Sequence, residues 1–158
     1  DIIRQKTASL IAAACSAGAA SITSDDATIE RVRLFGEKTG MAFQIRDDLF
    51  DFGTDDVGKP LGIDIKEKKM TLPLIYALNH ADRSTRRHII NLVKNESDKS
   101  DKVAEVIQFV RQSGGLEYAR DVMHRFRNEA FELLDEMPDG PARQSLRGLV
   151  LFVTERNK

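Results

Sequence analysis

Apolar residues along the chain recur at intervals of three and four positions, and glycines and prolines separate the blocks in which they do so. This spacing is typical of amphipathic helices, and no run alternates with the period of two that a half-buried strand requires. The pattern therefore predicts an all-α protein. Helices are expected over residues 1–22, 28–52, 66–79, 83–94, 99–113, 115–135 and 139–155.

Most of the segments between these blocks have the chemistry of helix ends. Segment 24–26 (SDD) can cap the second helix, and segment 71–73 (TLP) suits a helix start with proline in the first turn. The glycine pair at 114 and 115 and the segment 138–141 (PDGP) are expected to be breaks. A longer connection, FGTDDVGKPLGID over residues 52–64, contains three glycines and one proline.

Composition limits the size and the partners of this protein. With 158 residues, of which 41% are hydrophobic, the chain can bury one substantial core, so a single all-helical domain over residues 1–158 is expected. The 24 basic and 25 acidic side chains leave a net charge of −1, so no overall field attracts nucleic acid. Cys15 has no cysteine partner, and no apolar run reaches the roughly 18 to 20 residues that span a membrane. These features predict a soluble, cytoplasmic protein.

The stretch FQIRDDLFD, residues 43–51, concentrates negative charge in a predicted helix. Positions i, i+3, i+4 and i+7 of a helix share one face, and here they hold Gln44, Asp47, Asp48 and Asp51. The opposite face is an apolar stripe of Ile45, Leu49 and Phe52, which is expected to pack on a core and to aim the carboxylates outward.

Such a cluster favours a bound cation. Two carboxylates about 6 Å apart repel by about 3 kcal/mol at an effective dielectric of 20. Carboxylate oxygens at one-turn spacing suit Mg²⁺, which takes one or two carboxylates together with waters and substrate phosphate. A solvated acidic face is the alternative that spacing alone leaves open. A calcium loop starting at Asp51 is excluded, because Gly53, Asp56 and Gly62 stand at positions that need a ligand, a glycine and a glutamate.

The residues that follow the aspartates make an anion site more specific. Lys59, Asp64 and Lys69 come next in the chain, so cations and a further carboxylate can fold back over the aspartate face. Lysines would neutralise the phosphate oxygens that a metal leaves uncovered. The three histidines, His80, His88 and His124, fall in separate blocks and form no nucleophile set.

These residues resemble a known enzyme family. FQIRDDLFDF followed by GKPLGIDIKEKKMTLPLIYAL is similar to the second aspartate-rich region of the trans-isoprenyl (polyprenyl) diphosphate synthases. Lys6-Thr7 resembles their Lys-Thr motif, and LRGLVLFVTERNK at residues 146–158 resembles the ends of octaprenyl and related bacterial synthases. The resemblance covers essentially the whole chain and implies the helical bundle of isoprenoid synthases. It also implies a Mg²⁺-dependent prenyltransferase that joins isopentenyl diphosphate to an allylic diphosphate.

The resemblance also implies a role for each matching residue. The metal residues would be Asp47, a ligand of the Mg²⁺ on the allylic diphosphate, with Asp48 and Asp51 completing the motif. The catalytic and diphosphate-binding cations would be Lys6, Lys59 and Lys69. Thr7, Phe43 and Gln44 would line the allylic chain near the carbon that becomes cationic, and Asp64 would act in the outer shell.

In such a site the allylic diphosphate ionises and the double bond of isopentenyl diphosphate attacks the carbocation. Proton loss then completes the five-carbon extension. The cavity must exclude water, which would quench the cation. The small residues from Ala8 to Ala20 could leave room for a prenyl chain, and close helix packing is the alternative explanation for them.

The chain also departs from the family. Nothing matches the family's first aspartate-rich motif and its nearby arginine pair, so the chain resembles the C-terminal half of a synthase, which is expected to be inactive alone. Arg46 stands where the family usually has an apolar or small residue, and Lys68 stands where a glycine is common. A non-catalytic helical partner subunit or interaction module is the alternative function. The complete protein is expected to be a homodimer, and the chain does not reveal the product length.

Overall fold

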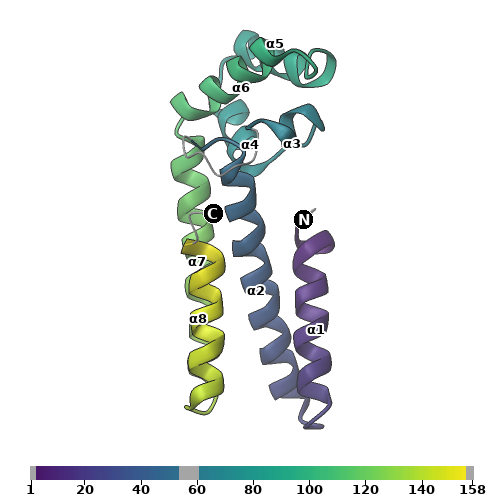
Figure 1. The fold of residues 1–158 in the computed structure, drawn as a ribbon, viewed down its shortest axis with the longest axis vertical. Helices are drawn as coiled ribbons and strands as arrows, with labels where there is room; N and C mark the ends of the chain where they lie inside the picture. The colour runs from purple at the N-terminus through teal and green to yellow at the C-terminus, as the bar shows by residue number, and fades with distance from the viewer. Residues whose placement is uncertain (1–2, 54–60, 156–158) are drawn as a thin grey trace. The chain divides into compact units, whose positions relative to one another are not determined.

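The computed structural model describes residues 3–53 and 61–155 (Figure 1). Every regular element in these residues is helical, which confirms the predicted all-α class. One π-helical turn, η1, is followed by eight α-helices. Their bounds are η1 Arg4–Ala8, α1 Ser9–Ala20, α2 Asp26–Phe50, α3 Ile63–Lys66, α4 Leu72–His80, α5 Arg83–Asn95, α6 Ser100–Gln112, α7 Gly115–Asp135 and α8 Pro141–Glu155.

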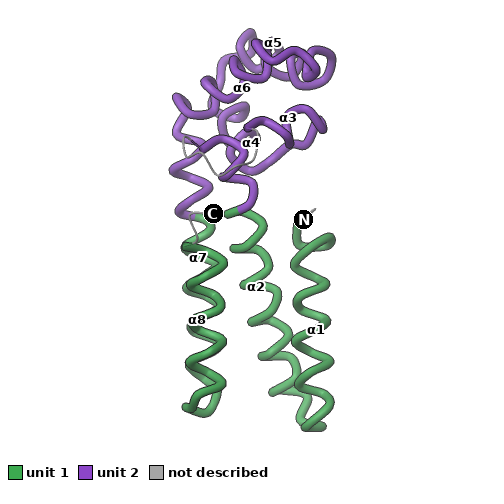
Figure 2. The backbone as a smooth tube through the Cα atoms, viewed as in Figure 1, with its two compact units in different colours: residues 1–46, 122–156 green, residues 47–121, 157–158 purple. Residues whose placement is uncertain are grey.

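The chain divides into two compact units, which are described separately (Figure 2). Unit 1 comprises residues 1–46 and 122–156, and unit 2 comprises residues 47–121 and 157–158. The two divisions fall inside α2 and α7, so each of these helices contributes to both units. In the described part of the chain, no helix is both long and apolar enough to span a bilayer.

Unit 1 contains η1, α1, most of α2, the second part of α7, and α8. Its apolar centre joins α2, α7 and α8 through Phe35, Ala130, Leu134 and Val150, all of which are buried. Ion pairs connect the same helices at the surface. Lys38 lies 2.7 Å from Glu129, and Arg127 lies 2.9 Å from Glu155.

The small residues at the beginning of the chain allow α2 to approach η1 and α1 closely. A Cβ added at Gly40 would lie 2.7 Å from the Cα of Ala8, and one added at Gly36 would lie 2.8 Å from the sulfur of Cys15. Ala8 and Ala12 are buried in this contact. Close helix packing is therefore confirmed for the residues of the small-residue run that face α2. Burial also raises the pKa of the Cys15 thiol, which disfavours the reactive thiolate.

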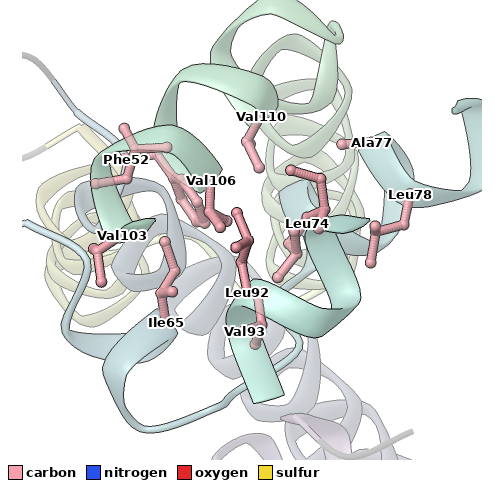
Figure 3. Close-up of a cluster of buried hydrophobic side chains, with 12 residues drawn as sticks. Phe52, Ile65, Leu74, Ala77, Leu78, Leu92, Val93, Val103, Val106 and Val110 are labelled. Carbon is pink, nitrogen blue, oxygen red and sulfur yellow. The ribbon is translucent and has the colours of Figure 1, made fainter. Parts of the chain in front are cut away.

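Unit 2 has its own core, shown in Figure 3. Twelve buried residues from the end of α2 through α6 form it: Phe52, Ile65, Leu74, Ala77, Leu78, Ile89, Leu92, Val93, Val103, Val106, Ile107 and Val110. The apolar stripe of α5 supplies three of them, Ile89, Leu92 and Val93.

Several predicted helix ends are confirmed. The Asp25 carboxylate accepts the N–H of Thr28 at 3.0 Å and so caps α2. Gly114, at φ +76°, separates α6 from α7, and Pro141 opens α8 after the turn that contains Gly140.

The helix predicted over residues 66–79 is wrong in its first part. The short helix α3 ends at Lys66, and α4 begins only at Leu72. Between them Lys68 has φ +59°, a left-handed conformation that no α-helix contains. Thr71 occupies the position before α4, but its hydroxyl makes no capping bond and is buried without a hydrogen-bond partner in the described part of the chain. Pro73 lies in the first turn, as the sequence predicts.

Candidate functional site

The predicted aspartates lie at the C-terminal end of α2 and just beyond it. Asp47 and Asp48 are in the last turn of the helix, whereas Asp51 follows Phe50, where the helix ends. The apolar stripe opposite them is confirmed, since Ile45, Leu49 and Phe52 are 0%, 7% and 0% exposed.

The expectation that all three carboxylates point outward is wrong. Asp47 is half-buried, but Asp48 and Asp51 are only 6% and 7% exposed. Asp51 differs from the helical projection because it lies past the end of α2, where a spacing of 100° per residue no longer applies.

The Asp51 carboxylate holds the start of α3. One of its oxygens accepts the N–H of Ile63 at 2.8 Å, and the other accepts the N–H of Asp64 at 3.1 Å. The Asp51 carbonyl in turn accepts the N–H of Gly62 at 3.1 Å. Burial raises the pKa of Asp51, and the negative charge of Asp64 adds to this effect, while the backbone N–H groups of Ile63, Asp64 and Ile65 oppose it.

Gly62 is required where the chain turns into α3. Its φ of +75° lies in the left-handed region, and a Cβ at this position would lie 2.3 Å from a methyl carbon of Val103 on α6. The glycine therefore allows the backbone to approach α6 while its N–H reaches Asp51. This explains the second glycine of the GKPLGID segment.

Lys69 is held by two carboxylates. Its ammonium lies 2.9 Å from Asp64 and 2.6 Å from Glu67. Both hydrogen bonds raise the pKa of Lys69, and the bond to Glu67 has the larger effect. The side chain of Lys69 is about half exposed, so the charged group remains accessible to an anion. Asp64 donates its backbone N–H to Asp51, and its carboxylate accepts a hydrogen bond from the Lys69 ammonium. Within unit 2, Asp64 therefore connects the aspartate region to a lysine.

Four of the other predicted site residues lie in unit 1. The hydroxyl of Thr7 donates a 2.9 Å hydrogen bond to the side-chain carbonyl of Gln44. Thr7 belongs to the π-helical turn η1, and wide turns of this kind are frequent at functional sites. Lys6 in the same turn is exposed, and Phe43 on α2 is half-buried. Lys59, the remaining predicted cation, lies outside the described residues.

The aspartates meet the needs of Mg²⁺ only together with a phosphate ligand. Across residues 3–53 and 61–155, no three His, Cys, Asp or Glu side chains surround a common metal position. Mg²⁺ needs only one or two carboxylates when phosphate and water supply the other oxygens, and the adjacent Asp47 and Asp48 fit that requirement. Asp51 fits it less well, because each of its oxygens already accepts a backbone N–H.

Sequence reasoning missed one residue in this region. Arg111, near the end of α6, donates from Nε to the carbonyl of Phe52 at 2.9 Å and from a terminal nitrogen to the carbonyl of Gly53 at 2.5 Å. No sequence signal identifies it, since Arg111 is 59 positions away from Phe52. Its cation binds carbonyls two and three residues beyond the C-terminus of α2, which is the negative end of the helix dipole.

A family model described as Polyprenyl synthetase matches residues 1–110, which include all the site residues discussed above except Arg111. The chain belongs to the polyprenyl synthetase family. This membership agrees with the helical class and with the resemblance carried by the aspartate, lysine and threonine positions. The match covers most of this chain, so the family applies to both compact units.

Individual members of the polyprenyl synthetase family resemble the chain along nearly its whole length. It is 38% identical over 157 residues to heptaprenyl diphosphate synthase component 2 of Geobacillus stearothermophilus and 37% identical over 158 residues to a short chain isoprenyl diphosphate synthase of Methanothermobacter thermautotrophicus. Each match includes at least 98% of this chain but only 48% of the relative. The chain therefore spans about half the length of these relatives.

A solved structure confirms the fold of this chain. The geranylgeranyl pyrophosphate synthase from Bacteroides thetaiotaomicron matches with a TM-score of 0.90 and 39% identity, over 99% of this chain and 52% of that one. The helical arrangement is therefore that of an isoprenyl diphosphate synthase, which is the fold class that the sequence predicts.

Proposed function

We propose that this chain is the C-terminal half of a Mg²⁺-dependent prenyltransferase, which condenses isopentenyl diphosphate with an allylic diphosphate to make a longer trans-polyprenyl diphosphate. One observation carries the proposal. The Asp51 carboxylate accepts the backbone N–H groups of Ile63 and Asp64, and the Asp64 carboxylate pairs with the Lys69 ammonium. These bonds lie beside the helix end that bears Asp47 and Asp48. Carboxylates and an ammonium group held this close together suit a metal-bound diphosphate.

The proposed roles follow from the chemistry of each group. Bound Mg²⁺ would supply positive charge to the departing diphosphate. Asp47 and Asp48 would hold it, and the Lys69 ammonium would donate hydrogen bonds to diphosphate oxygens. Lys6 and Lys59 would neutralise further oxygens, as the family resemblance implies. Asp64 would keep Lys69 in place, and Asp51 would fix the start of α3 that carries Asp64.

The reaction requires the allylic C–O bond to break, with both electrons leaving on the diphosphate. The double bond of isopentenyl diphosphate then donates its electron pair to the allylic cation, and loss of a proton restores a double bond. In unit 1, the Thr7 and Gln44 oxygens are proposed to face this developing positive charge, with Phe43 beside the prenyl chain. Their mutual hydrogen bond fixes the direction of the Gln44 amide.

The decisive experiment measures transfer of radiolabelled isopentenyl diphosphate to farnesyl diphosphate in the presence of Mg²⁺. The complete gene product and this 158-residue chain are compared, each beside Asp47→Ala and the exposed control Asp121→Ala. The proposal expects activity in the complete protein that Asp47→Ala abolishes and Asp121→Ala retains, with no activity in the 158-residue chain. Absence of transfer in the complete protein would exclude the catalytic role.

A helical partner subunit is the second candidate. The Geobacillus stearothermophilus relative is named component 2 of its synthase, a name that implies another component. If the protein acts in this way, the complete gene product gives no transfer alone and gains it when the cognate partner chain is added. A homodimer of the complete protein, which the family resemblance implies, would instead be active by itself.

A further inference from the structure

The C-terminal end of α2 has an electrostatic problem that the helix itself does not solve. Its last turn contains Asp47 and Asp48 and no basic residue, and Asp51 follows immediately. The carbonyl groups at the C-terminus of a helix carry partial negative charge, so carboxylates there are unfavourable and loosen the last turn. A cation supplied by another element stabilises such a helix end.

Arg111 supplies that cation. Its side chain is half-buried, and its two bonds reach the Phe52 and Gly53 carbonyls, which come directly after the third aspartate. A planar guanidinium that bonds two successive carbonyls fixes both their distance and their direction, which a single ammonium cannot do. All of these groups belong to unit 2.

The same backbone segment is also bonded to the start of α3. The Asp51 carboxylate accepts the N–H groups of Ile63 and Asp64, and Gly62 donates to the Asp51 carbonyl. Residues 51–53 are therefore bonded both to α6, through Arg111, and to the start of α3. Displacement of the Phe52 and Gly53 carbonyls would move the Asp51 backbone and the preceding turn of α2.

We propose that Arg111 is a positioning residue for Asp47 and Asp48, acting through the Phe52 and Gly53 carbonyls. The inference rests on the proposed function, because it concerns the same Mg²⁺ and allylic diphosphate. Arg111 does not touch either ligand in this scheme. It sets the orientation of the carboxylates that do, in the way that outer residues orient metal ligands elsewhere.

The test compares Arg111→Met, Arg111→Gln and Arg111→Lys in the complete gene product. Met removes the charge and every donor, Gln keeps one donor group without the charge, and Lys keeps the charge with one ammonium. Arg87→Met on α5 is the matched control, since Arg87 is an exposed arginine of the same unit and makes no ion pair within the described residues.

The first readout is hydrogen exchange measured by mass spectrometry. Peptides covering residues 47–53 and 61–66 should exchange faster in Arg111→Met and Arg111→Gln, while Arg111→Lys is intermediate and Arg87→Met matches the wild type. Unchanged exchange over these peptides in a folded Arg111→Gln protein would overturn the inference, whatever its activity. This readout does not depend on turnover.

The second readout is the Mg²⁺ concentration that gives half-maximal isopentenyl transfer. It should rise about 10-fold to 100-fold in Arg111→Gln, with partial recovery in Arg111→Lys. A purely structural role would lower the melting temperature and the amount of active protein but leave this Mg²⁺ concentration unchanged. That result would refute the inference and leave the proposed function intact. If the wild-type protein shows no transfer, the proposed function fails, and the inference fails with it.

Discussion

Thr7 and Gln44 are 37 positions apart in the chain, yet the hydroxyl of one lies 2.9 Å from the side-chain carbonyl of the other. The contact depends on Gly40, one turn before Gln44 on α2, where a side chain would collide with the backbone of Ala8. The Lys-Thr motif is thus placed against α2 by the small residues that follow it.

Replacing Thr7 by valine removes the hydroxyl while keeping the shape of the side chain. We expect a loss of about 1 kcal/mol in the free energy of unfolding, because one half-buried hydrogen bond disappears. Thr7→Ser retains the donor and is expected to lose less. Urea denaturation of the two variants beside the wild type measures the difference, and equal stability of Thr7→Val and wild type would show that the bond contributes nothing.

Lys68 is expected to be replaceable by glycine with a gain in stability. Its φ of +59° costs roughly 1 kcal/mol for a residue with a side chain, and glycine adopts this conformation freely. We therefore expect Lys68→Gly to raise the free energy of unfolding by up to about 1 kcal/mol. Lys68→Ala is the control for loss of the charge, and should not be stabilised. A gain of the same size in both variants would assign the effect to the charge.

Gly62→Ala is expected to destabilise unit 2 by about 2 to 3 kcal/mol, through a strained backbone and a collision with Val103. Adding Val103→Ala should recover the part due to the collision but not the part due to φ. A double-mutant cycle of denaturation curves separates the two contributions. Strict additivity of the two substitutions would mean that the collision with Val103 does not exist.

Asp82 gives a pH-dependent prediction. Its carboxylate caps α5 by accepting the Thr85 hydroxyl and the N–H groups of Thr85 and Ser84, at 2.6, 3.1 and 2.8 Å, and these bonds lower its pKa. Because the pKa of Asp82 is lower in the folded state, its ionised carboxylate stabilises the fold at pH values above the ordinary aspartate pKa of 3.8. This contribution is lost as the pH falls through the lower folded-state pKa.

The measurement is the melting temperature of wild type and Asp82→Ala from neutral pH to below pH 3 (about one unit below the ordinary value). The wild type should melt higher at neutral pH, and the two curves should converge as the pH falls. A difference that stays constant over this range would show that the charged form of Asp82 adds nothing to the cap.

Periodicity predicts the long helices well because their buried faces are set by local spacing. The bounds of α2, α5 and α7 follow from it to within two residues. It fails between α3 and α4, where the left-handed conformation of Lys68 breaks the chain although the residue itself is a good helix former. The lysine itself does not mark the break. The family resemblance, in which glycine is common at position 68, and the TLP segment at 71–73 are the sequence features that agree with it.

The candidate site is predictable from sequence only in part. The helical spacing of Asp47 and Asp48 by itself identifies a carboxylate pair, and the following lysines indicate its chemistry. The second role of Asp51 is not visible, because its partners Ile63 and Asp64 lie across a connection whose path the sequence does not specify. Arg111 is still more remote, and only the folded chain brings it to the end of α2.

Lys69 provides the most direct test of anion binding. Under the proposed function, Lys69→Met in the complete protein removes a charge-assisted hydrogen bond to the diphosphate, and the KM for the allylic diphosphate should rise by about tenfold or more. Lys66→Met is the matched control, since Lys66 is an exposed lysine at the end of α3.

Asp64→Asn separates binding from positioning. It leaves Lys69 charged and beside Glu67 but weakens its link to Asp51, so a smaller rise in KM is expected than for Lys69→Met. Steady-state kinetics at saturating Mg²⁺ measure both effects. If Lys69→Met and Lys66→Met change the KM equally, the lysine acts only through the general surface charge, and the ordered series from Asp51 to Lys69 has no part in substrate binding.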